Sequence, residues 1–300
     1  MVHGVAVDAG SGLATAIRTA RGAMAQNDDL FTFKRAVVRA LSPMASTLLV
    51  DATLGPRLLP DYAPPCTPMM AFEADVYRID TADRITVLPD DLTVADFPRL
   101  GVRQLKLFLW YAPDDDPALN ARKHALVERV GQDCAAQGLT FLMEPLVYHP
   151  TLQPGTQAYA ALKPALVRRA VETFADPRFG AHILKVEVPV DLSFAGGFGQ
   201  AQTLRTDALA AFRDVVAAAR GLPVVFLSGG VPFPMFEASL RLAHASGAPF
   251  AGFMCGRALW SEAVAVFGAE GEQAVIDWLM INGRDRLARL IAATGGHDAA

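Results

Sequence analysis

Little in this sequence of 300 residues points to a secreted or membrane-bound protein. Its three cysteines, Cys66, Cys134 and Cys255, are widely spaced and odd in number. This spacing fits neither a disulfide framework nor a zinc site. No apolar run approaches the roughly 20 residues that cross a bilayer, and no basic segment followed by an apolar run marks a signal peptide. We therefore expect a cytoplasmic protein with reduced thiols and no membrane partner.

Charge is also scarce, and it is not concentrated in any segment. Charged residues make up 19% of the chain, and the net charge of −4 includes no basic stripe, so nothing indicates a nucleic-acid partner. None of the six histidines belongs to a His-x-His pair of the kind that binds a metal. The hydrophobic share is 52%, which is typical of a globular protein with a large buried core.

Short apolar runs alternate with helix-like stretches along the chain. Most of the runs are apolar at every position, as expected for parallel strands that are buried on both faces. Eight strands alternating with helices predict an α/β protein, a (β/α)8 TIM barrel that forms a single domain over residues 1–300. A doubly wound sheet is the competing architecture. The predicted strands are Gly4–Asp8, Thr47–Asp51, Met69–Glu73, Gln104–Tyr111, Phe141–Val147, Ile183–Pro189, Val224–Ser228 and Phe250–Gly256, and the helices include Leu30–Leu41, Pro117–Gln137, Lys163–Phe174, Asp207–Arg220 and Pro234–Ser246.

Charged residues near the ends of these apolar strands are informative, because burying an unpaired charge is costly. In a barrel, the C-terminal ends of the strands point into the active-site mouth. Lys185 and Glu187 are two positions apart, so their side chains lie on the same face of one strand. The alternative is a buried ion-pair network with no catalytic role. The charged residues are Asp8, Lys106, Glu144, Lys185 and Glu187.

A lysine in such a mouth has a chemical use. Its ordinary pKa is about 10.4, but desolvation and a neighbouring cation lower the pKa of an amine, which can then attack a carbonyl. Lys106 and Lys185 both lie on buried strands, and each could be the cation that lowers the pKa of the other. A carboxylate such as Glu144 could remove a hydroxyl proton from the substrate.

The ends of predicted strands seven and eight are rich in glycine. They read Leu227-Ser-Gly-Gly-Val231 and Cys255-Gly-Arg257. Barrels often bind phosphate with the loops after these two strands and a nearby helix N-terminus. Small residues let backbone N–H groups approach the anion, and an arginine adds bidentate charge. The two loops therefore predict a phosphate site, although Gly229 and Gly230 could also merely form a turn.

Six stretches of the chain resemble the class I tagatose-1,6-bisphosphate aldolase family, which includes the sulfofructose-phosphate aldolases. The resemblance runs over most of the chain, and the order and spacing of the stretches make it specific. The stretches are Leu41–Asp51, Leu105–Tyr111, Glu144–Tyr148, Leu184–Asp191, Phe226–Val231 and Cys255–Trp260.

The resemblance implies a role for each candidate residue. Lys185 would be the Schiff-base lysine, and Glu144 would transfer protons. Lys106 would be a second lysine that activates Lys185 and polarises the substrate. Asp8 would contact the substrate, and Glu187 would support the site. The residues that would bind the 1-phosphate are Ser228, Gly229, Gly256 and Arg257.

The activity implied by the resemblance is the cleavage of a ketose 1-phosphate or 1,6-bisphosphate to dihydroxyacetone phosphate and an aldehyde. The substrate would be similar to tagatose 1,6-bisphosphate or 6-sulfofructose 1-phosphate. The cleavage would use a covalent Schiff base and no metal or other cofactor. The expected partner is thus a small-molecule sugar phosphate, and family analogy suggests a homo-oligomer. Two other functions stay open: a non-catalytic sugar-phosphate sensor, and a metal-dependent barrel aldolase or isomerase.

The chain departs from the family after the first predicted strand. There the family usually has a glutamine and then an arginine, which lie towards the distal anion of the substrate. In this chain, Asp8 is followed by Ala9, Gly10, Ser11 and Gly12. Either Arg18, Arg57 or another base replaces the missing arginine, or the substrate carries no anion at that end.

Overall fold

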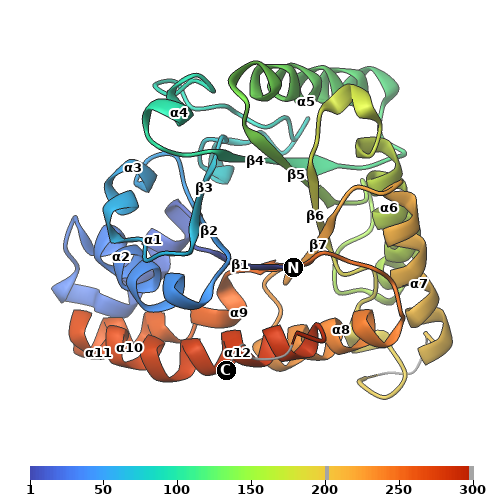
Figure 1. Cartoon of the computed structure of the whole chain (residues 1–300). Helices are drawn as coiled ribbons and strands as arrows, with labels where there is room; N and C mark the ends of the chain where they lie inside the picture. Colours follow the sequence, from blue (N-terminus) through green and yellow to red (C-terminus); the bar gives the residue numbers. More distant parts are fainter. Residues whose placement is uncertain (200–202, 297–300) are drawn as a thin grey trace.

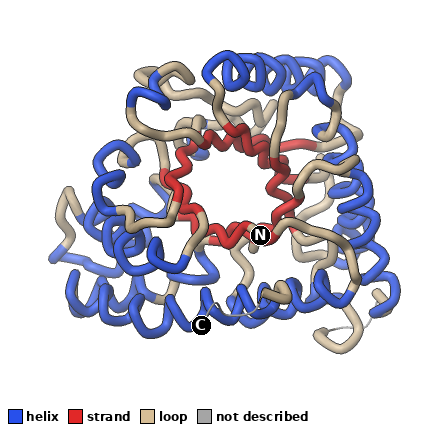
Figure 2. Tube along the Cα trace, in the orientation of Figure 1, coloured by secondary structure: helices blue, strands red, loops and turns tan. Residues whose placement is uncertain are grey.

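The computed structural model describes residues 1–199 and 203–296. Within these residues, eight parallel strands form a closed barrel in sequential order, and β1 pairs with β8 to close the ring. Figures 1 and 2 show the ring of strands enclosed by helices. The predicted (β/α)8 barrel is confirmed, and the doubly wound sheet is excluded because such a sheet does not close.

All eight predicted strands are present, but seven of them differ from the prediction at one or both ends. The prediction for β4 was correct to the residue, but the one for β1 was wrong at both ends, so Asp8 lies in the loop two residues beyond the strand. The inward-facing pattern continues past the last regular pairing, and Val7 N still donates to the carbonyl of Leu49 at 2.8 Å. The strands are β1 Val2–Ala6, β2 Thr47–Val50, β3 Thr67–Ala71, β4 Gln104–Tyr111, β5 Thr140–Val147, β6 Ile183–Glu187, β7 Val224–Leu227 and β8 Gly252–Cys255.

Most helices follow their strands where the sequence predicts them. The prediction for α5 was correct to the residue, because the Asp116 carboxylate caps its N-terminus and Gly138, with φ of +62°, ends it. Helix α6 begins six residues earlier than expected, at a Thr156 cap. The helices are α1 Ser11–Arg21, α2 Asp29–Leu41, α3 Gly55–Leu58, α4 Asp96–Arg99, α5 Pro117–Gln137, α6 Gln157–Phe174, α7 Arg205–Ala218, α8 Phe233–Ala245, α9 Arg257–Trp260, α10 Ala263–Glu270, α11 Glu272–Trp278 and α12 Arg284–Ala293. No helix in the described part of the chain is long and apolar enough to cross a membrane.

The core has two layers. The larger layer lies between the strands and the helices, and the smaller one fills the barrel interior. Side chains alternate between the two along each strand. The residue two positions after an interior apolar residue therefore also faces inward, but nearer to the mouth. The interior apolar residues are Ala6, Leu49, Met69, Ala71, Leu142, Val225 and Met254.

Candidate active site

A cavity of about 1480 Å³ opens at the C-terminal ends of the strands. Its lining combines apolar walls with a few polar groups, which is typical of a small-molecule site. All the site residues predicted from the sequence line it: Asp8, Lys106, Glu144, Lys185, Glu187, Ser228, Gly229, Gly256 and Arg257.

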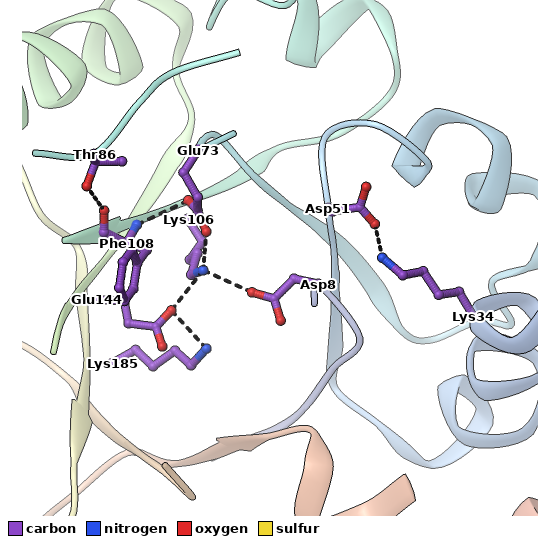
Figure 3. Close-up of polar contacts among 9 residues, drawn as sticks. All are labelled: Asp8, Lys34, Asp51, Glu73, Thr86, Lys106, Phe108, Glu144 and Lys185. Carbon is purple, nitrogen blue, oxygen red and sulfur yellow. Dashed lines mark hydrogen bonds and ion pairs between the residues drawn. The ribbon is translucent and has the colours of Figure 1, made fainter. Parts of the chain in front are cut away.

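Four of these residues form a continuous chain of polar contacts (Figure 3). The Nζ atom of Lys185 donates to Oε2 of Glu144 at 3.0 Å. The same oxygen lies 2.9 Å from Nζ of Lys106, which in turn donates to Oδ2 of Asp8 at 2.9 Å. Lys106, Glu144 and Lys185 are each no more than 6% exposed. One buried carboxylate therefore contacts both lysines.

Glu73 completes this cluster, and it was not among the predicted site residues. One of its oxygens pairs with Nζ of Lys106, and the other accepts the N–H of Phe108 at 3.1 Å. The sequence did contain a signal, because Glu73 follows Ala71 by two positions and so shares its inward face. Asp51 shares the same relationship with Leu49, and it pairs with the fully buried Lys34 (Figure 3).

The two lysines of the cluster differ in the number of carboxylates that surround them. Burial alone would lower the pKa of Lys106, but the carboxylates of Asp8, Glu144 and Glu73 outweigh burial and hold that pKa well above its ordinary value. Lys106 is therefore a fixed ammonium group. Lys185 pairs with Glu144 alone within the described structure. This difference favours Lys185 as the nucleophile and Lys106 as a neighbouring cation.

The carboxylates of Asp8 and Glu73 differ in the direction in which their pKa is shifted. Burial raises the pKa of Asp8, but Lys106 and Lys185 outweigh burial and hold it below its ordinary range. Burial raises the pKa of Glu73, and Lys106 offsets only part of that effect. Asp8 is therefore a fixed anion, which helps to keep Lys106 charged.

The two loops predicted to bind phosphate follow the neighbouring strands β7 and β8, which lie between β6 and β1. Gly229 and Gly230 have φ angles of +59° and +83°, and Val231 N donates to the carbonyl of Ser228 at 3.1 Å. The segment is thus a turn, as the alternative interpretation held, and it also lines the cavity. A Cβ atom on Gly230 would lie 2.5 Å from the guanidinium of Arg257. Glycine therefore lets this arginine lie directly against the turn.

Gly256 brings the end of β8 close to β1. A Cβ atom at this position would lie 2.5 Å from the carbonyl oxygen of Ala6, which accepts the indole N–H of Trp260 at 2.8 Å. The close approach fixes where Arg257 begins helix α9. Arg257 is exposed to the cavity and contacts no carboxylate in the described residues. Its charge can therefore bind an anion.

Glu187 supports the site from its edge. Its Oε2 atom accepts the N–H of Val147 at 2.9 Å, which joins the ends of β5 and β6. Its Oε1 atom lies 3.6 Å from Nζ of Lys163 on α6. Glu187 thus contacts neither lysine of the central cluster in these interactions. The supporting role of Glu187 stays a prediction.

The two arginines considered as substitutes for the family arginine do not reach the cavity. Neither Arg18 nor Arg57 contributes to its lining. The guanidinium of Arg57 lies 3.9 Å from the ring centroid of Phe31 and 3.3 Å from a carboxylate oxygen of Asp28. Neither Arg18 nor Arg57 therefore replaces the family arginine at the end of β1.

Comparisons with known proteins find similar sequences and a similar fold among aldolases. Residues 3–262 match the model of the DeoC/LacD family aldolases. A tagatose 1,6-diphosphate aldolase of Listeria monocytogenes is 30% identical over 97% of this chain and 86% of its own. A protein of that name from Staphylococcus epidermidis is 38% identical over 81% of this chain and 75% of its own. A fructose-bisphosphate aldolase structure from Plasmodium falciparum shares the fold, with a TM-score of 0.72 at 16% identity, over 100% of this chain and 93% of its own.

Proposed function

Because this chain belongs to the DeoC/LacD family of aldolases and is thus an aldehyde-lyase, we propose that it is a class I enzyme acting through a Schiff base on Lys185. Its substrate would be a ketose 1-phosphate, and its products dihydroxyacetone phosphate and an aldehyde. One observation carries the proposal: a single buried oxygen of Glu144 lies within 3.0 Å of Lys185 and 2.9 Å of Lys106.

The reaction begins with the transfer of a proton from Lys185, for which Glu144 is the adjacent acceptor. The neutral amine attacks the C2 ketone, and Glu144 returns the proton to the former ketone oxygen, which leaves as water. An iminium remains, and Glu144 is again a carboxylate. Lys106 stays charged throughout, because three carboxylates surround it. Its role is to polarise the substrate oxygens and to keep a positive charge beside the reacting centre.

Cleavage then uses the iminium as an electron sink. Glu144 removes the proton of the C4 hydroxyl, the C3–C4 bond breaks, and its electron pair forms an enamine. The aldehyde leaves, Glu144 returns a proton to C3, and hydrolysis releases dihydroxyacetone phosphate. The iminium does what a Lewis acid would do, so the proposed reaction needs no metal.

The phosphate of the substrate would bind at the turn after β7 and at Arg257. Ser228, Gly229 and Gly230 line the cavity there, and the Arg257 guanidinium lies against Gly230. In this proposal, the anion would lie on one side of Lys185 and the rest of the sugar on the other. The three buried free cysteines suit a reducing compartment, so we place the enzyme in the cytoplasm.

The test is borohydride trapping with dihydroxyacetone phosphate, read by intact mass and then by peptide mapping. The expected result is one stable adduct, located on Lys185. Folded protein that binds the ligand but gives no adduct on any lysine would overturn the Schiff-base mechanism. Loss of turnover on chelation would then indicate the metal-dependent alternative, and absence of any turnover the sensor.

A further inference from the structure

On β4 and β5, the inner face of the barrel is apolar one step nearer to the mouth than Glu144. Phe108 and Glu144 are neighbours across the two strands (Figure 3), and the next inward pair is Trp110 and Leu146. Side chains two positions apart share a face of a strand, and all four of these residues line the cavity. An indole and an aliphatic side chain therefore lie directly above the Glu144 carboxylate.

Three side chains fix the orientation of the Trp110 indole. The rings of Phe108 and Tyr148 contact it edge-on, with ring centroids at 5.3 and 6.5 Å. The guanidinium of Arg84 lies 5.7 Å from the indole centroid and 4.1 Å from the ring centroid of Tyr148. Tyr148 and Arg84 do not line the cavity, so they support the indole from the side away from it. Trp110 is only partly buried, so the rest of its ring faces the cavity.

The support behind Trp110 is itself anchored by buried polar contacts. The hydroxyl group of Tyr148 accepts a hydrogen bond from Nζ of the fully buried Lys123 at 3.0 Å and donates one to the Asp115 carboxylate. A ring that is already held in place loses little conformational entropy when a ligand contacts it. The Trp110 indole is therefore a preorganised contact surface.

The other two tryptophans of the chain do not offer such a surface. Trp260 also lines the cavity, but it is buried and its N–H is bonded to the carbonyl of Ala6. Trp278 is partly buried and does not line the cavity. Trp110 is thus the tryptophan whose ring a substrate can contact.

The proposed reaction brings the last carbons of the substrate to this indole. The phosphate would lie after β7 and β8, the C2 atom at Lys185 on β6, and the C4 hydroxyl at Glu144 on β5. The next strand in that direction is β4, which is opposite β8 in the ring of eight. C5 and C6 therefore continue from Glu144 towards the mouth at β4, where Trp110 lies.

We propose that Trp110 determines the specificity for the aldehyde half of the substrate, which is a hydroxyaldehyde of at least three carbons whose C–H face stacks on the indole. This inference rests on the proposed function. Tryptophan presents a large, rigid apolar face, which suits the C–H groups of a sugar chain while its hydroxyl groups point away. The dihydroxyacetone phosphate half does not reach Trp110.

The test runs the reaction in the direction of condensation. Dihydroxyacetone phosphate is mixed with glycolaldehyde, which supplies C4 and C5, or with racemic glyceraldehyde, which also supplies C6. The expected kcat/KM in wild type is about tenfold higher for glyceraldehyde, because one further carbon in an apolar contact is worth roughly that much or more. In Trp110→Leu, this preference should fall to about twofold or less, through a higher KM for glyceraldehyde at nearly unchanged kcat.

A matched control is Trp278→Leu. Trp278 is also partly buried and has an arginine guanidinium, that of Arg286, 5.1 Å from its ring centroid, but it is outside the cavity. This variant should keep the wild-type preference. Trp110→Phe keeps a smaller ring, and its preference should fall to about threefold. The borohydride adduct of dihydroxyacetone phosphate on Lys185 should form at the wild-type rate, within about twofold, in all three variants, because that half of the substrate does not contact Trp110.

Equal use of the two aldehydes by wild type would overturn the inference, and so would an adduct on Lys185 without condensation of either aldehyde. Equal losses for both aldehydes in Trp110→Leu, with slower adduct formation, would show that Trp110 only supports the fold. If Trp110→Leu does not fold, Trp110→Phe decides, and an undiminished preference in that variant would contradict the stacking. Absence of the adduct in wild type would instead contradict the proposed function.

Discussion

Glu144 and Lys185 face each other across neighbouring strands of the barrel, with 3.0 Å between Oε2 and Nζ. The same oxygen contacts Lys106. This carboxylate can thus exchange protons with the nucleophile while a fixed cation lies beside it. Proton transfer during C3–C4 cleavage is therefore expected to depend on Glu144 more than on any other carboxylate of the mouth.

Glu144→Gln should lower kcat for condensation by roughly 10²–10⁴-fold, because general acid–base catalysis contributes about that much. The exchange of the C3 proton of dihydroxyacetone phosphate with solvent deuterium, followed by NMR, should slow to a similar extent. Glu187→Gln is the matched control. It removes a carboxylate that lines the same cavity but bonds to Val147 and Lys163, so its loss should be much smaller. Equal losses in the two variants would argue against a proton-transfer role for Glu144.

Replacing Lys106 by methionine should destabilise the protein more than replacing Lys185. Lys106→Met leaves the carboxylates of Asp8, Glu73 and Glu144 close together without their shared cation, and breaking a buried ion network in this way costs roughly 3–5 kcal/mol. In Lys185→Met, Glu144 keeps Lys106 as its partner, so the loss of stability should be smaller, about 1–2 kcal/mol. Urea unfolding measures both values.

Borohydride trapping with dihydroxyacetone phosphate should also distinguish Lys185 from Lys106. Lys185→Met should form no borohydride adduct although it stays folded. Lys106→Met should still form one on Lys185 under conditions where it is folded, at a lower rate. An adduct on Lys106 in Lys185→Met would show that either lysine can act as the nucleophile.

The sequence alone was sufficient to predict the barrel and most of its mouth. The barrel was predicted from eight apolar runs that alternate with helix-like stretches, and the mouth from charged residues near the ends of those runs. Helix α5 was located correctly because its capping residues are local signals. The ends of β1 were not predictable in this way. Asp8 continues the inward alternation of Gly4 and Ala6, so nothing in the pattern marks where regular pairing stops.

The unpredicted part of the site depends on contacts between distant segments. Glu73 became a member of the cluster only because β3 and β4 are neighbours, which puts its carboxylate beside Lys106. Asp75 meets Ser11, a residue 64 positions away, through a loop without a regular pattern. Hydrophobic periodicity carries no information about such pairs, whereas the charged strand ends could be found because charge is rare in buried strands.

Asp8→Asn should weaken folding in a pH-dependent way. The pKa of Asp8 is lowered in the folded protein, so its ionised form contributes stability that is present above its unfolded pKa of about 3.9 and is lost as the pH falls below it. At pH 7, the free energy of unfolding should be about 1–3 kcal/mol lower than in wild type. The difference should be the same at pH 5.5 and should shrink at pH 3.5. A difference that does not change over this range would contradict the ion pair with Lys106 as its source.

Two glycines with similar backbones allow the phosphate site to be tested apart from backbone strain. Gly230 and Gly221 have φ angles of +83° and +94°, so alanine at either position should cost roughly 1 kcal/mol in stability. A Cβ atom at Gly221 would meet no atom within 4 Å, whereas one at Gly230 would lie 2.5 Å from Arg257. Gly230→Ala should therefore displace the guanidinium and raise KM for dihydroxyacetone phosphate about tenfold or more, since a charge-assisted contact is lost. Gly221→Ala should leave KM unchanged. Equal KM values in the two variants, measured at matched folded fractions, would mean that Arg257 does not bind the phosphate.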